Sequence, residues 1–149
     1  MNREILFRGK PIGNWEWVEG FVVINENGEC FIKDTDYNVN NGKCDLIPAR
    51  VDPETVGQYT GLKDKNGLRI FEGDIVEFKL QDADEYRFAK ILYGEFIDEN
   101  DSQFYLGFYV VGMGCTFSIF NGKDEGCDFI GMCEVAGNVH DSPELLVAE

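Results

Sequence analysis

The chain has 149 residues, of which 44% are hydrophobic and 13% aromatic, with a formal net charge of −15 at pH 7 and a sequence pI of about 4.3. This length suits one domain, or two small lobes, with a real core, and the apolar content excludes a disordered chain. The negative charge argues against direct binding to nucleic acid or to an anionic membrane, and it suits a basic partner.

The acidic residues are unevenly distributed. Residues 1–50 contain six basic and eight acidic residues, a balance of −2, so residues 51–149 carry the remaining −13. Two interpretations of this acidic second part stay open. It is either a contact surface for a partner or a means of keeping the protein dissolved and monomeric.

The opening MNREILFRGK contains Arg3 and Glu4, and no long apolar run follows it, so we expect no signal peptide. No stretch approaches the roughly 20 apolar residues of a membrane-spanning helix. The sequence therefore predicts a cytoplasmic protein.

The first elements in the chain are predicted to be strands. The 17 glycines against 4 prolines favour an all-β chain with many turns. Strands are expected at 4–9 and 15–24, with the large side chains of Trp15, Trp17 and Phe21 packed in the core. Residues 25–28 then form a hairpin turn into a strand at 29–33, and the polar stretch 34–45 forms a loop.

The middle of the chain carries the clearest local signals. Asp52 before Pro53 and Glu54 predicts a short capped helical turn. The Asn66-Gly67 pair between apolar flanks predicts a hairpin. Gly73 predicts a tight bend into a strand at 75–78.

The second part continues with strands separated by acidic loops. Strands are expected at 87–96, 104–113, 116–120 and 129–132, with loops at 81–86, 98–101 and 121–128. Gly137 and Asn138 are expected to turn, and Pro143 to begin a short helix whose leucines close the core. The sequence thus predicts an all-β fold of small barrel-like lobes with one or two helical turns. We expect a single domain 1–149, made of an N-terminal lobe 1–50 and a C-terminal lobe 51–149.

The chemistry-bearing residues are sparse. The odd number of cysteines, with no CxxC pair, predicts free thiols rather than a zinc site; they are Cys30, Cys44, Cys115, Cys127 and Cys133. His140 is the only imidazole, and the acidic clusters at 98–101 and 124–126 lack the ligand spacing of a calcium loop. We therefore expect no catalytic residues, no metal, no cofactor and no enzyme activity.

One candidate site remains. Tyr59 and Thr60 stand close in sequence to Glu72 and Asp74, which flank the glycine bend. An aromatic ring and two carboxylates near such a bend predict a surface groove.

Three blocks of sequence resemble the YopX protein family. They are the opening FRGK with Trp15 and Gly20, the segment VDPETVGQYTGLKDKNGLRIFEGDIV, and the closing EVAGNVHDSPELL. The resemblance implies a small protein of a phage or prophage in a bacterial host, mostly β, with barrel-like lobes. It implies no activity and no catalytic residues.

Three functional hypotheses follow. The first is an accessory protein that binds a host or phage protein through its acidic surface. The second is a decoy that imitates the charge of DNA and occupies a basic nucleic-acid-binding protein. The third is a hydrolase with a metal held by loop carboxylates. Open strand edges must be covered or paired, so we also expect a homo-oligomer.

Overall fold

The computed structural model describes residues 4–13, 16–34, 48–79, 85–112, 114–120 and 129–146. It confirms a mainly β fold, with 59% strand and 10% helix. The strands are β1 (Phe7–Gly9), β2 (Val18–Ile24), β3 (Cys30–Asp34), β4 (Ala49–Val51), β5 (Gly57–Lys63), β6 (Arg69–Phe71), β7 (Asp74–Lys79), β8 (Tyr86–Asp98), β9 (Gln103–Gly112), β10 (Cys115–Ser118) and β11 (Glu134–Asn138). The helical elements are η2 (Pro53–Thr55), α1 (Phe129–Met132) and η4 (Pro143–Leu146).

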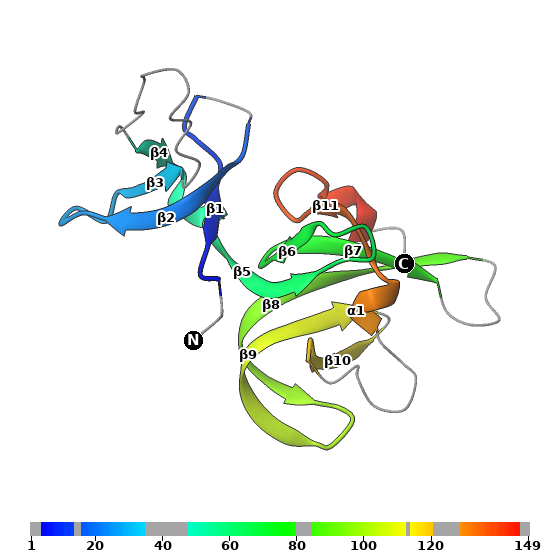
Figure 1. Ribbon diagram of the computed structural model, residues 1–149. Helices are drawn as coiled ribbons and strands as arrows, with labels where there is room; N and C mark the ends of the chain where they lie inside the picture. The colour runs from blue at the N-terminus through cyan, green and yellow to red at the C-terminus, as the bar shows by residue number, and fades with distance from the viewer. Residues whose placement is uncertain are drawn as a thin grey trace. The chain divides into compact units, whose positions relative to one another are not determined.

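The chain divides into two compact units, Met1–Tyr59 and Thr60–Glu149. This boundary lies after the one that we expected at residue 50, because η2 and the start of β5 bond to the first unit. The Lys10 amide donates to the Thr55 hydroxyl at 2.9 Å, and the Tyr59 amide donates to the Leu6 carbonyl at 2.8 Å. Strand β5 begins in the first unit and continues into the second (Figure 1).

The first sheet has the order β4-β3-β2-β1-β5-β6, and the strand pairs from β4 to β5, which lie in the first unit, are antiparallel. Its buried face carries a small apolar core of Cys30, Ile32 and Val51, against which Phe7, Val18, Val22 and Val56 pack. The predicted turn at 25–28 is confirmed, since the Gly28 amide donates to the Asn25 carbonyl at 3.1 Å. The predicted cap is confirmed too, because the Asp52 carboxylate accepts from the Glu54 amide.

The expectation that Phe21 packs in the core is wrong. Its side chain is 57% exposed, whereas the neighbouring Gly20 is buried. A Cβ built on Gly20 would lie 1.8 Å from the Lys33 carbonyl oxygen, so only glycine fits at this close approach to β3. Side chains alternate along a strand, so Phe21 faces outward while Val22 packs on the core. Trp17 is half-buried, and Trp15 lies outside the described residues.

The second unit contains the β5–β6 hairpin and a curled antiparallel sheet in the order β10-β9-β8-β7-β11 (Figure 1). Its core is larger than that of the first unit. The buried residues are Ile70, Val76, Phe78, Ala89, Ile91, Phe108, Val110, Ile119, Ile130 and Cys133. The predicted Asn66-Gly67 turn and Gly73 bend are confirmed, with φ of 83° at Gly67 and 90° at Gly73.

The strand expected at 129–132 is wrong, because these residues form helix α1. The Cys133 thiol donates to the Phe129 carbonyl, and the Cys133 amide donates to the Ile130 carbonyl. The last strand of the sheet is instead β11, which pairs with β7 and has an irregular register between Val135 and Gly137. The predicted short helix at Pro143 is confirmed as η4, but Leu145 and Leu146 are only half-buried. The turn expected at Gly137 and Asn138 is wrong, because both residues lie in β11.

A buried carboxylate, Asp64, joins the β5–β6 turn to β11. Its oxygens accept hydrogen bonds from the amides of Asn66, Leu68 and Val135, each at 2.9 Å. Burial raises the pKa of Asp64, but these three donors and the nearby Lys65 charge outweigh burial, so the pKa lies below its ordinary value.

The predicted loops at 34–45, 81–86 and 121–128 lie wholly or mostly outside the described residues.

Candidate interaction surface

The four residues of the predicted groove have different environments. Tyr59, Thr60 and Asp74 are buried, and Glu72 is half-buried. The Thr60 hydroxyl donates to the Ile70 carbonyl at 2.8 Å, and the Asp74 carboxylate accepts from the Phe71 amide at 2.8 Å. Thr60 and Asp74 therefore hold neighbouring backbone groups of β6. A groove formed by all four residues stays a prediction.

The thiols and the imidazole are dispersed. Cys30 and Cys133 are buried free thiols, Cys115 is exposed, and His140 is exposed in the turn after β11. Cys44 and Cys127 lie outside the described residues. Over the described ranges, no three His, Cys, Asp or Glu side chains lie close enough to hold a metal ion. Nor does any helix there have the length and apolar character needed to cross a membrane.

The most distinctive surface is on the end of the β8–β9 hairpin. We call residues 93–107 the distal hairpin. In its register Phe96 is paired with Tyr105, Ile97 with Phe104, and Glu95 with Leu106. Paired residues project from the same face of a hairpin, and neighbours along a strand project from opposite faces. The distal hairpin thus has an inner face and an outer face of known composition.

Gly94 separates two patterns of burial in β8. Before it, the buried residues are Ala89 and Ile91; after it, they are Phe96 and Asp98. Gly94 has φ of 151°, a conformation that residues with a Cβ rarely adopt. The side chains that continue the alternation of Ala89 and Ile91 are exposed in the distal hairpin.

The inner face is packed around Phe96. The Phe96 ring stacks on Tyr109 with centroids 4.7 Å apart, and Tyr105 lies beside it at 5.8 Å. The fully buried Asp98 accepts from the amides of Asn100 and Ser118, each at 2.8 Å. These contacts fix the tip of the hairpin against β10.

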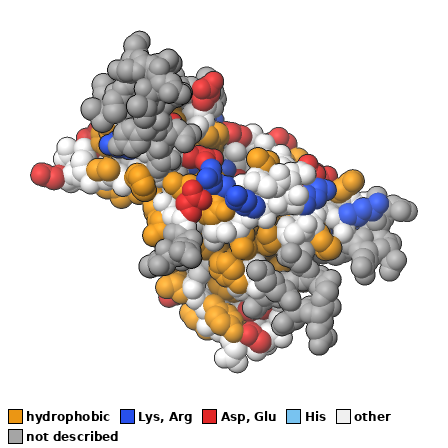
Figure 2. Space-filling model, viewed as in Figure 1, with side chains coloured by type: hydrophobic (Ala, Val, Ile, Leu, Met, Phe, Trp, Pro, Cys, Tyr) orange, Lys and Arg blue, Asp and Glu red, His pale blue; other side chains and the backbone are white. Residues whose placement is uncertain are grey.

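The outer face is apolar and exposed. Ile97, Phe104 and Leu106 are 56%, 65% and 69% exposed, and Tyr93 is also exposed, with its ring against Phe108. Figure 2 shows hydrophobic side chains at the surface of the lower part of the second unit, where Figure 1 places β8 and β9. Contiguous exposed apolar side chains of this kind mark interaction sites.

The charge of the distal hairpin has one sign. Residues 93–107 contain no Lys or Arg, and their acidic residues are Glu95, Asp98, Glu99 and Asp101. All of these except Asp98 are exposed, and Glu95 lies on the outer face beside Leu106. The Tyr105 hydroxyl donates to the Asp101 carboxylate, and this hydrogen bond raises the pKa of Tyr105. The outer face is therefore apolar with one carboxylate, Glu95, on it, and the tip of the hairpin beyond it carries Glu99, which accepts from the Thr116 amide, and Asp101.

Sequence reasoning identified a strand at 104–113 but not this surface. The run FYLGFYVV is apolar at nearly every position, so its alternation does not separate buried from exposed residues. The available signal was the absence of basic residues between Tyr93 and Gly107.

Comparison with known proteins identifies a family across nearly the whole chain. The family described as "YopX protein" matches residues 7–147. A search of curated proteins found no match. Because the match covers almost all of both units, the chain belongs to the YopX protein family.

Proposed function

We propose that this protein is a binding protein, not an enzyme, and that it acts by holding another protein on the outer face of the distal hairpin. The proposed setting is a phage or prophage in the cytoplasm of a bacterial host. The single observation that carries the proposal is the exposure of Ile97, Phe104 and Leu106 on an outer face whose charged side chains are acidic.

The packing of the hairpin supports this proposal. An exposed apolar strand pair would ordinarily be a liability, because it invites aggregation. Here the inner face fixes the backbone through Phe96 and Asp98, so the strands that carry the outer side chains need no reordering on binding. Preorganised apolar residues lose little conformational entropy when a partner covers them.

The chemistry of the face defines the partner. Apolar side chains of the partner would cover Phe104 and Leu106, a lysine or arginine beside them would face Glu95, and further basic side chains would lie near the acidic tip at Glu99 and Asp101. Such charge complementarity raises the association rate and selects among apolar partners. A nucleic acid lacks both the apolar side chains and the positive charge.

The test is capture from nuclease-treated host lysate with the full-length protein as bait. The wild type is compared with Phe104→Thr and Leu106→Thr, which keep β-propensity while removing apolar area. A Leu68→Thr bait is the control, since Leu68 is 55% exposed but lies in the β5–β6 turn.

We expect a protein captured by the wild type and the Leu68 variant but lost from both hairpin variants. Once purified, that protein should bind the wild type directly, with affinity that falls as salt rises. A partner retained by both hairpin variants would refute the assignment of this face.

A further inference from the structure

The first unit has an exposed sheet face of its own. Phe21 lies opposite Lys33 in the register of β2 and β3, Val23 lies opposite Phe31, and Phe31 lies opposite Arg50 on β4. Arg8 on β1 lies opposite Glu19, two residues before Phe21. These side chains project from one face, which we call the β2 face; its residues are Arg8, Glu19, Phe21, Val23, Phe31, Lys33 and Arg50.

The β2 face combines apolar and basic side chains. Phe21 and Val23 are more than half exposed, and Phe31 is half-buried between them and Arg50. Three of the seven residues are basic and one is acidic, and Glu29, which pairs with Arg50, places a second carboxylate at the edge of the face. This is unusual in a chain whose acidic residues outnumber its basic residues 28 to 13.

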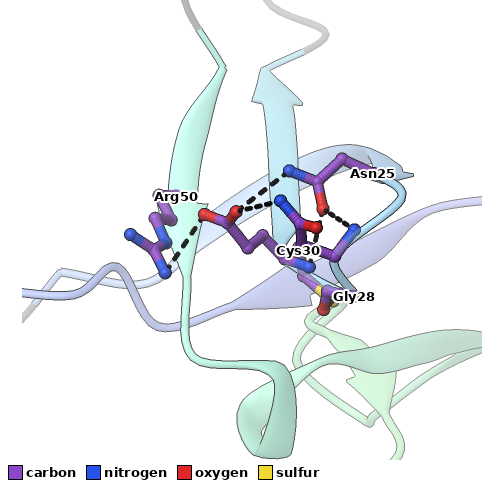
Figure 3. A network of polar contacts seen from close by, with 6 residues as sticks. Asn25, Gly28, Cys30 and Arg50 are labelled. Carbon is purple, nitrogen blue, oxygen red and sulfur yellow. Dashed lines mark hydrogen bonds and ion pairs between the residues drawn. The ribbon is translucent and has the colours of Figure 1, made fainter.

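Arg50 is held in place at the edge of this face (Figure 3). Its guanidinium lies 3.2 Å from the Glu29 carboxylate, which also accepts hydrogen bonds from the side chains of Asn25 and Asn27. The Arg50 side chain remains 57% exposed in this pairing. On β1, the Arg8 guanidinium lies 4.8 Å from the centre of the Trp17 ring.

We propose that the β2 face of one copy of this chain binds the distal hairpin of a second copy. The two surfaces match in kind: each has exposed apolar side chains, and the basic residues of the first meet the acidic residues of the second. Two distal hairpins placed against each other would instead bring Glu95, Glu99 and Asp101 of both copies together, and like charges disfavour that pairing.

The proposed contact joins two different surfaces, so it is heterologous. Each copy retains a free β2 face or a free hairpin after the first contact, and the assembly extends or closes into a ring. The inference rests on the proposed function in that both use the distal hairpin. A foreign partner and a second copy compete for it.

The test uses the purified full-length chain alone in sedimentation-velocity experiments over a range of concentrations. Phe21→Thr combined with Lys33→Glu impairs the β2 face, and Phe104→Thr impairs the hairpin. Ile24→Thr is the matched control, because Ile24 is 64% exposed on β2 but alternates to the other face. Circular dichroism and tryptophan fluorescence verify that each variant is folded.

We expect wild type and Ile24→Thr to form larger species as concentration rises, and each impaired variant alone to sediment as a monomer. Mixing the two impaired variants should restore a dimer, because one supplies an intact hairpin and the other an intact β2 face. That complementation is specific to a heterologous contact.

The inference is wrong if the wild type stays monomeric at about 100 µM, which corresponds to very weak binding. It is also wrong if oligomers survive both sets of substitutions. Failure of the two impaired variants to form a dimer when they are mixed would overturn it as well. None of these results depends on a lysate partner. If the chain does not self-associate but captures a lysate protein, the proposed function still holds. If it self-associates but captures no lysate protein, this inference still holds.

Discussion

Ile97 and Phe104 lie directly opposite each other in the register of β8 and β9, and each side chain is more than half exposed. The pair one position closer to the base of the hairpin, Phe96 and Tyr105, projects from the other face, where Phe96 is buried against Tyr109. The same short hairpin therefore separates a stability-determining face from an exposed one.

Substitutions on the two faces should differ in their effect on stability. Phe104→Thr should change the free energy of unfolding by no more than about 0.5 kcal/mol, as exposed substitutions do. Phe96→Ala should lower it by about 3–5 kcal/mol, because it removes a buried ring. Urea unfolding followed by circular dichroism measures both. Equal losses would show that the outer face is also packed.

The Asp64 carboxylate should be a major stabilising group of the second unit. Asp64→Ala leaves three backbone amides without their acceptor and should lower the free energy of unfolding by about 2–4 kcal/mol. Lys65→Ala is the control. Its ammonium lies 3.4 Å from Glu134 in a half-exposed ion pair, which contributes less than about 1 kcal/mol. The idea fails if the two variants are equally stable.

Acid should remove the contribution of Asp64. Its pKa is lowered in the folded protein, so the carboxylate stabilises the fold above the unfolded value of about 3.9. That contribution is lost as pH falls through the lower folded pKa. The stability difference between wild type and Asp64→Asn should be constant near neutral pH and shrink in acid. Parallel curves down to about pH 2 would contradict this assignment.

Gly20 should not tolerate a side chain. Gly20→Ala places a Cβ within 1.8 Å of the Lys33 carbonyl oxygen, so β2 and β3 must separate. We expect a loss of at least about 2 kcal/mol. Both tryptophans, Trp15 and Trp17, lie in the first unit, so their fluorescence follows its unfolding.

Gly107→Ala is the matched control for Gly20. Gly107 is also in a strand, but a Cβ there meets no atom within 4 Å. This variant should be as stable as the wild type to within about 0.5 kcal/mol, or slightly more stable. A loss equal to that of Gly20→Ala would mean that strand glycines matter here for another reason.

The parts of the fold that the sequence predicted depend on local chemistry. Asn66-Gly67, Gly73 and Asp52-Pro53 each restrict a few backbone angles regardless of what packs around them, and all three features are present. The lone helix was missed for the opposite reason. The four residues of α1 are too few and too apolar for periodicity to separate a helix from a strand.

The candidate surfaces depend on relationships between distant residues. Phe21 projects outward while Gly20 packs against Lys33, and the outer face of the distal hairpin continues the alternation of Ala89 and Ile91 past Gly94. A glycine in a sequence marks a place where the backbone is free, but not which neighbouring side chain becomes exposed. The sequence alone shows that residues 93–107 contain acidic but no basic residues. Only the register of β8 and β9 shows which of these residues lie beside the exposed apolar side chains.

The continuity of β5 determines how this chain can be divided into fragments. Gly57 and Gln58 pair with β1, while Thr60 bonds to the Ile70 carbonyl in β6. A cut after residue 50 would deprive the first fragment of η2 and of the strand that covers the edge of β1. A cut between Tyr59 and Thr60 leaves each of these bonds inside one fragment, but it ends both fragments within β5, at two buried residues.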